Sequence, residues 1–143
     1  MWWKEIMPSS KIDGAFGDSA NGFGSTITVW TNNSDGYTLT LKDSDTTTDL
    51  MNANGDKIAA GTTIEAGTSN WAYKIISQDG TNVSVPAYAA IVSSEGTAAQ
   101  IAQTNAKTST SGSVSTVAYG VSTSNAQPTG IYADTIVYTA TTR

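Results

Sequence analysis

Apolar and polar positions alternate with a period of two along much of the chain, and the spacing of an amphipathic helix does not recur. Residues Ser25 to Thr31 read S-T-I-T-V-W-T, and residues Tyr37 to Lys42 read Y-T-L-T-L-K. Such alternation is typical of a strand that buries one of its faces. The intervening residues, Asn32 to Gly36, are types that favour turns. The sequence therefore predicts that the two strands form a hairpin.

Further strands are indicated by short alternating or apolar runs between turn residues. About seven to eight short strands, with no helix-length segment to connect parallel strands, predict an all-β fold and an antiparallel β-sandwich. A closed barrel is the competing shape. Tyr88 to Ile91, together with the alanine-rich stretch Ala98 to Ala102, leaves a short helical turn as an alternative there. The further predicted strands are Thr62 to Glu65, Asn70 to Ile76, Thr81 to Val85, Gln100 to Thr104, Ser113 to Ser122 and Ile131 to Thr142.

The domain organisation follows from where the alternation begins. A chain of 143 residues has the length of one domain. Residues 24–143 are predicted to form the sandwich, and residues 1–23, in which glycine and polar positions break the alternation, are predicted to form an irregular N-terminal arm. The predicted core residues are Ile27, Val29, Tyr37, Leu39, Leu41, Trp71, Tyr73, Ile75, Val117, Tyr119, Val121, Ile136 and Tyr138.

The composition argues against catalysis. The chain has 17 serines and 23 threonines, only 19 charged residues, and neither histidine nor cysteine. Without histidine the usual proton acceptor near neutral pH is missing, so a serine or threonine hydroxyl lacks the base that would activate it. The acidic residues form no recognisable pair for hydrolysis. We therefore expect that the protein is not an enzyme and that it has no cofactor.

The charge argues against nucleic-acid binding, and the length of the apolar stretches argues against a membrane span. The net charge is −5 with seven scattered Lys and Arg residues, so the clustered cations that bind nucleic acid are missing. The longest apolar stretches fall far short of the roughly 20 residues that span a membrane. The first residues, Met1 to Met7, contain neither the apolar region nor the cleavage pattern of a secretory leader. If the protein is secreted, the leader is absent from this chain.

Four blocks of the sequence form a recognisable pattern. They are T-V-W-T-N-N-S-D-G-Y-T-L-T-L from Thr28, N-W-A-Y from Asn70, V-P-A from Val85 and V-A-Y-G-V-S-T-S-N-A-Q-P-T-G-I-Y-A-D-T-I-V-Y-T-A-T from Val117. In this order they resemble a family of secreted surface proteins that is abundant in candidate-phyla bacteria such as Saccharibacteria and occurs in some Gram-positive bacteria. The resemblance covers residues 24–142, although Ala72 stands where the family usually has glycine. The closing block is also similar to the last strand of spore-coat-type pilin domains.

The resemblance implies an extracellular immunoglobulin-like β-sandwich that is displayed on the cell surface or assembles there. It supplies no catalytic residue. It leads us to expect a structural subunit of a surface filament, pilus-like fibre or lattice, in which copies of the chain associate through the N-terminal arm or by strand addition at a sheet edge. The residues expected at that interface are Trp2, Trp3, Ile6, Met7 and Trp30.

Two other binding activities follow from residue types. Exposed aromatic rings on a sandwich also suit sugars, so the alternative function is an adhesin or carbohydrate-binding module whose partner is a surface polysaccharide or a host cell. In addition, short oxygen-bearing side chains gather between positions 43 and 56, as a weak calcium loop would require. Solvated turns are the competing interpretation of that segment. The candidate ligands are Asp43, Asp45, Asp49, Asn54 and Asp56.

Overall fold

The computed structural model describes residues 4–6, 11–16, 25–84 and 86–143; for residues 4–6, 11–16 and 82 it describes the backbone alone. All regular structure in these residues is strand, which confirms the predicted all-β fold. Ten strands have three or more residues, so the predicted number of seven to eight is too low. The strands are β1 (Lys4–Ile6), β2 (Lys11–Phe16), β3 (Ser25–Val29), β4 (Tyr37–Asp43), β5 (Leu50–Met51), β6 (Lys57–Ala60), β7 (Asn70–Gln78), β8 (Thr81–Asn82), β9 (Tyr88–Ala89), β10 (Ala99–Gln103), β11 (Ser113–Ser122), β12 (Gly130–Tyr132) and β13 (Ile136–Thr142).

The larger sheet is built around two long antiparallel strands, β7 and β11. Along the edge that faces away from β7, β11 pairs with β2 near one end and with β3 near the other. Along the edge that faces away from β11, β7 pairs in turn with the short strands β6, β9 and β8. Because short strands border both central strands, the interior of this sheet is hydrogen-bonded over most of its length.

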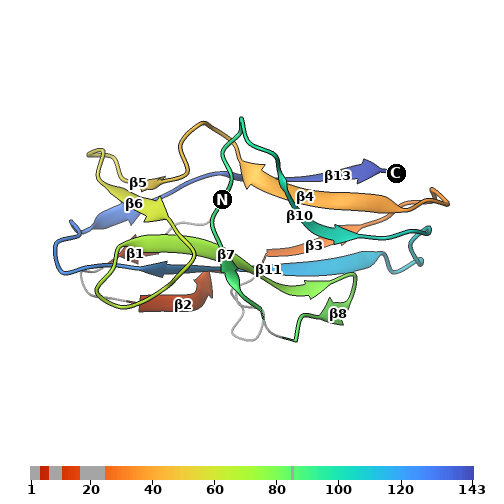
Figure 1. Ribbon diagram of the computed structural model, residues 1–143, viewed down its shortest axis with the longest axis horizontal. Coiled ribbons are helices and arrows are strands. Elements are labelled where there is room, and N and C mark those ends of the chain that lie inside the picture. The colour runs from red at the N-terminus through yellow and green to blue at the C-terminus, as the bar shows by residue number, and fades with distance from the viewer. Residues whose placement is uncertain (1–3, 7–10, 17–24, 85) are drawn as a thin grey trace.

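The smaller sheet has three antiparallel strands in the order β10, β4, β13. It lies above β7 and β11 in Figure 1, so the fold is sandwich-like. A separate antiparallel pair, β1 with β12, stands beside these sheets. Among the described strands, β13 pairs with β4 alone and is therefore an edge strand.

The core lies between the layers. On β4 the residues at every second position, starting with Tyr37, are buried and the others are half-buried. Trp71 of β7 stacks on Tyr119 of β11 with ring centroids 6.3 Å apart. All predicted core residues are buried or pack partly buried against the core, which confirms the predicted strand faces. Five buried residues of this core cluster were not predicted, namely Ile58, Ile91, Ile101, Ala102 and Tyr132.

The predicted hairpin between residues 25–31 and 37–42 is wrong. β3 pairs with β11 in the larger sheet, whereas β4 pairs with β10 and β13 in the smaller one. The turn itself is present, because the N–H of Gly36 donates to the carbonyl of Asn33 (3.1 Å) and Gly36 has a φ of 80°. The turn carries the chain from one sheet to the other, a choice that turn-forming residues alone do not determine.

Four other local predictions differ from the structure. Part of the predicted irregular arm is paired, because β1 lies along β12 and β2 along β11. The sandwich is not purely antiparallel, since β6 runs parallel to β7. The predicted strand from Ile131 to Thr142 is divided, because Ala133 forms a bridge with Met51 and the chain then turns toward the smaller sheet. The predicted strand from Thr62 to Glu65 is a connection instead.

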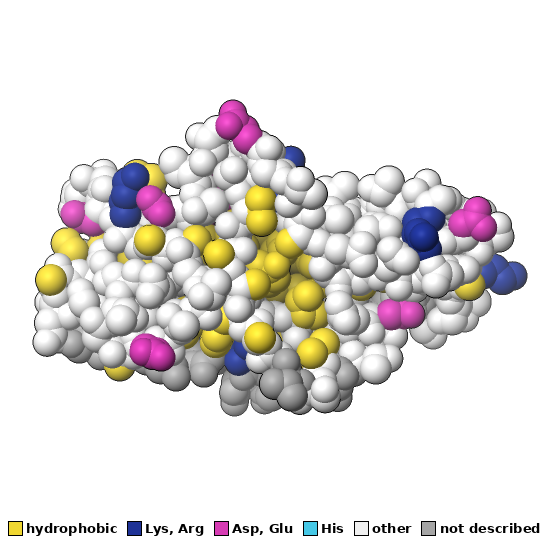
Figure 2. Space-filling view, viewed as in Figure 1, with side chains coloured by type: hydrophobic (Ala, Val, Ile, Leu, Met, Phe, Trp, Pro, Cys, Tyr) yellow, Lys and Arg dark blue, Asp and Glu magenta, His cyan; other side chains and the backbone are white. Residues whose placement is uncertain are grey.

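The surface reflects the unusual composition. The face in Figure 2 carries few charged side chains, and most of it is uncharged polar side chain and backbone. Serine and threonine occupy outward positions of several strands, as at Thr26, Thr139 and Thr141, whereas Ser113, Ser115, Thr116 and Ser122 of the central strand β11 are buried. In the part of the chain that the structure describes, no helix is long and apolar enough to cross a membrane.

Candidate functional site

Three aspartates from two separate parts of the chain meet beside the end of β4. Asp43 is the last residue of this strand and continues the inward positions of Leu39 and Leu41, so its side chain is fully buried. Asp45 follows in the exposed connection. Asp134 comes from the connection between β12 and β13. The pairing of β13 with β4 brings this connection next to Asp43.

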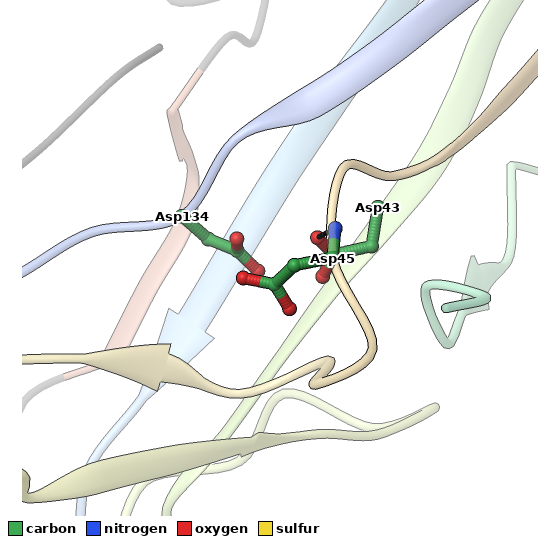
Figure 3. Close-up of side chains that lie close together, drawn as sticks. All are labelled: Asp43, Asp45 and Asp134. Carbon is green, nitrogen blue, oxygen red and sulfur yellow. Dashed lines mark hydrogen bonds between the residues drawn. The ribbon is translucent and has the colours of Figure 1, made fainter. Parts of the chain in front are cut away.

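The carboxylate oxygens of the three aspartates converge. One oxygen from each lies within 4.8 Å of the others, and Figure 3 shows Asp134 reaching across toward Asp43 and Asp45. Oδ1 of Asp43 accepts a hydrogen bond from the N–H of Asp45 (3.0 Å), and Oδ1 of Asp134 accepts one from the N–H of Thr135 (2.6 Å). The Oδ2 atoms of Asp43 and Asp134 are buried, and neither has a hydrogen-bond partner.

Backbone contacts fix the position of the two connections. The N–H of Asp43 donates to the carbonyl of Val92 (2.8 Å), and the N–H of Ser44 donates to the carbonyl of Thr135 (3.0 Å). The backbone carbonyl of Asp45 accepts from the N–H of Ser94 (2.7 Å). The aspartates are therefore held together by β-type hydrogen bonds, and their convergence does not depend on flexible side chains alone.

The electrostatics of the cluster favour an added positive charge. Burial raises the pKa of Asp134 to about 7, and the neighbouring carboxylates of Asp43 and Asp45 shift it in the same direction; the N–H of Thr135 opposes them. Like charges in a partly dry site disfavour one another's ionised forms. The cluster can therefore hold a proton or a metal cation. Because Asp43 is fully buried, it offers no surface for a substrate.

The structure divides the predicted calcium loop into two groups. Asp43 and Asp45 join the cluster with Asp134. Asp49 forms an ion pair with Lys57 (3.3 Å) instead. Asp56 accepts a hydrogen bond from Nδ2 of Asn52 (2.8 Å), and Oδ1 of Asn52 accepts the N–H of Asn54 (3.0 Å). This second group, with Asn54 exposed, forms a solvated turn.

Sequence reasoning did not include Asp134 among the ligands. It stands far from Asp43 in the chain, in the closing block that resembles the last strand of pilin domains. One signal for the site was present in the sequence, because the alternation of Tyr37, Leu39 and Leu41 puts Asp43 at the next inward position. A carboxylate on the buried face of a strand is rare unless it has a partner.

The residues predicted at an assembly interface are only partly described. Trp2, Trp3 and Met7 lie outside the described residues. Ile6 ends β1, where its backbone pairs with Gly130 of β12. Trp30 follows β3 and is 64% exposed. Trp30 is therefore the member of this set whose exposure the described residues establish.

Trp30 lines a shallow, open groove between two connections. The groove is formed by residues 30–32 after β3 and by residues 107–110 between β10 and β11. The N–H of Thr31 donates to Oγ1 of Thr108 (3.0 Å), and the N–H of Thr108 donates to the carbonyl of Thr31 (3.0 Å). A Cβ added to Gly112 would lie 2.8 Å from Nε1 of Trp30, so a glycine backbone lies directly against the indole.

No family model matches the sequence, and neither a curated protein nor a solved structure matches the chain. The resemblance to secreted surface proteins therefore stays a prediction.

Proposed function

We propose that this protein is an extracellular structural subunit of a surface filament, fibre or lattice, and that copies of the chain associate by strand addition at the edge strand β13. The observation that carries this proposal is the open edge of β13, which has seven residues and a partner on one side only among the described strands. An edge of this length that lacks charges is a template for another strand.

The pairing of β13 with β4 indicates which of its peptide groups are available. In an antiparallel pair, residues that exchange both hydrogen bonds with the partner strand alternate with residues whose N–H and C=O point away. The N–H of Ser44 donates to the carbonyl of Thr135, and the N–H of Arg143 donates to the carbonyl of Gly36. The odd-numbered residues of β13 therefore bond to β4. The outward peptide groups belong to Ile136, Tyr138, Ala140 and Thr142.

The edge strand β13 lacks the features by which monomeric proteins prevent their sheet edges from pairing with another chain. β13 reads I-V-Y-T-A-T-T and contains no proline and no charged residue. Its last four residues are exposed on both faces. Lysines, prolines or bulges on an edge strand would hinder pairing with another chain. Added strands would be held by backbone hydrogen bonds, and the low charge of the surface would limit repulsion between copies.

The finer assignment as an immunoglobulin-like sandwich, and the location at the cell surface, belong to the same proposal. Their support is the resemblance of the sequence blocks and the buried Trp71, which lies on a central strand and stacks across to β11. Such a tryptophan is common in immunoglobulin-like domains.

Electron microscopy of the purified protein tests the proposal, together with the variant Ala140→Pro. We expect filaments or a lattice for the original chain, and their loss in the variant, because proline removes an outward N–H without removing a bond to β4. Ala140→Thr is the matched control and keeps the amide hydrogen, so it should assemble. A monodisperse monomer of the original chain, or unchanged filaments of a folded Ala140→Pro variant, would contradict assembly through this edge.

Association through the N-terminal arm is tested separately. The double variant Trp2→Ser and Trp3→Ser changes the arm and leaves β13 intact. If the double variant still forms filaments, the arm is excluded as the contact between copies. If the double variant forms none while Ala140→Pro still does, the contact is assigned to the arm.

An adhesin or carbohydrate-binding module is the second candidate, because of the Trp30 groove. The indole is exposed, and the groove also presents hydroxyl, amide and lysine side chains. Aromatic faces with nearby polar groups suit sugar rings. Retention of the monomeric protein on polysaccharide beads would support this function if Trp30→Ala abolished it. Ile131→Ala is the control and should still be retained, because Ile131 is an exposed hydrophobic residue that does not line the groove.

A further inference from the structure

We propose that Asp43, Asp45 and Asp134 bind a calcium ion, which joins the end of β4 to the beginning of β13. This site differs from the loop predicted from the sequence, because it contains Asp134 and excludes Asp49, Asn54 and Asp56. It does not depend on the proposed assembly, since a monomer has all three ligands.

The carboxylate of Asp43 is the observation that points to a ligand. Its side chain is fully buried at an inward position of β4. Only one of its oxygens has a donor, the N–H of Asp45, and the buried Oδ2 has none. Buried charged oxygens are otherwise paired with donors or coordinate metals. Since the carboxylate of Asp43 converges with those of Asp45 and Asp134, a cation bound among them would supply a partner for it.

The geometry of the three carboxylates suits one ion. Calcium binds oxygen ligands at about 2.3–2.6 Å, so two oxygens on the same ion are at most roughly 5 Å apart. The oxygens of Asp43, Asp45 and Asp134 satisfy this limit, since all lie within 4.8 Å of one another. Calcium accepts irregular coordination and completes its shell with water or carbonyl oxygens, whereas magnesium demands near-octahedral geometry. Three aspartates on two connections are therefore better suited to calcium.

The neighbouring lysines have other partners. Nζ of Lys42, although adjacent to Asp43 in sequence, donates to the carbonyl of Ser94 (2.8 Å). Lys57 pairs with Asp49. Neither side chain is therefore positioned to neutralise the cluster. Asp45 is exposed, so an ion can enter from solvent on its side of the site.

A bound ion would stabilise a particular junction of the fold. Asp43 and Asp45 flank the point where the chain leaves β4, and Asp134 lies just before β13. The N–H of Ser44 already donates to the carbonyl of Thr135 between these connections. Coordination by all three aspartates would add a second link at the same place, and would replace repulsion among the carboxylates by attraction to the ion.

Calcium titration of the purified protein tests the site, with calorimetry and the melting temperature as readouts. Calcium sites of extracellular modules bind at roughly 10⁻⁴–10⁻³ M, so the titration extends to about 10 mM. We expect heat of binding and a rise of several degrees in melting temperature relative to EDTA. Magnesium at the same concentration should give a smaller rise.

Two variants and a matched control locate the ion. Asp45→Asn changes an exposed ligand, and Asp134→Asn removes one of the repelling charges, so both should fold; both should lose the rise caused by calcium. Asp49→Asn is the control, because Asp49 lies in the same acidic segment but pairs with Lys57, and it should keep the rise. Absence of heat and of any shift in the original chain would overturn the proposal and leave a shared proton as the partner of Asp43. The proposal would also be overturned if calcium raised the melting temperature of Asp45→Asn and Asp134→Asn as much as that of the original chain.

Discussion

The hydroxyl groups of Tyr119 and Tyr138 lie 2.5 Å apart and form a hydrogen bond between the two layers of the fold. Tyr119 belongs to the central strand β11 of the larger sheet, and Tyr138 belongs to the edge strand β13 of the smaller one. Burial raises the pKa of both hydroxyls, so both stay protonated at neutral pH. The pair links the edge strand to the aromatic core, because Tyr119 also stacks on Trp71.

Removing one hydroxyl of this pair should lower the free energy of unfolding. For Tyr138→Phe we expect a loss of about 1 kcal/mol, the usual net value of a hydrogen bond, plus the cost of leaving Tyr119 without this partner. Urea unfolding of Tyr138→Phe, Tyr119→Phe and the double variant measures the effect. The double variant should lose less than the sum of the two single losses. Strictly additive losses would show that the two hydroxyls do not interact.

Two glycines with the same backbone conformation should respond differently to alanine. Gly36 and Gly55 have φ values of 80° and 86°, so alanine at either position costs roughly 1–2 kcal/mol of backbone strain. A Cβ at Gly55 meets nothing within 4 Å, whereas at Gly36 it would lie 2.3 Å from the carbonyl oxygen of Thr104. Gly36→Ala should therefore destabilise the protein by about 1–3 kcal/mol more than Gly55→Ala. Thermal or urea unfolding measures the difference, and equal losses would contradict the close packing at Gly36.

A core leucine and an exposed isoleucine provide a test of the layer interface. Leu39 of β4 is 1% exposed, and Ile131 of β12 is 53% exposed. Leu39→Ala should lower the free energy of unfolding by about 2–5 kcal/mol, through lost burial and a residual cavity. Ile131→Ala should cost less than about 1 kcal/mol. Urea unfolding measures both free energies. Equal losses in the two variants would contradict the burial of Leu39 between the two sheets.

The aspartate cluster should make stability depend on pH in the absence of metal. The folded-state pKa of Asp134 is about 7, above its ordinary value of 3.8. The folded protein therefore retains this proton after the unfolded chain has lost it, and stability should fall as the pH rises from about 4 to about 7. Urea midpoints measured in EDTA across this window should decline in the original chain.

Asp134→Asn has no carboxyl group at this position, so the decline should be smaller in that variant. An identical decline in both proteins would assign the pH dependence to other groups. The comparison is made in EDTA because a bound cation would compete with the proton for the same oxygens.

The strand faces were predictable because burial on a strand is a local property. Tyr37, Leu39 and Leu41 of β4 alternate with less buried polar neighbours, and the period of two decides which side is buried. The five unpredicted core residues include Ile58 and Tyr132, which lie on short strands with too few positions to establish a period. Tyr132 is buried with its hydroxyl bonded to Gln127 and Pro128, contacts that have no counterpart in the local pattern.

Strand partners were less predictable, because pairing depends on contacts between distant segments. The turn at Asn33 and Gly36 suits a hairpin, yet the flanking strands enter different sheets. The backbone groups of β3 are satisfied by β11, and those of β4 by β10 and β13. Either arrangement satisfies the local hydrogen-bonding groups, so the choice depends on how the whole set of strands buries its apolar faces.

Local pattern and composition were enough to predict that the chain folds from strands, which side of several of them is buried, and that the surface is rich in hydroxyl groups and poor in charge. That β13 is an edge and that Asp134 lies beside Asp43 became visible in the folded chain alone. The difference lies in the range of the interactions. Alternation of side chains is set by the geometry of a single strand, whereas an edge or a cluster of carboxylates arises from the pairing of segments that are far apart in the chain.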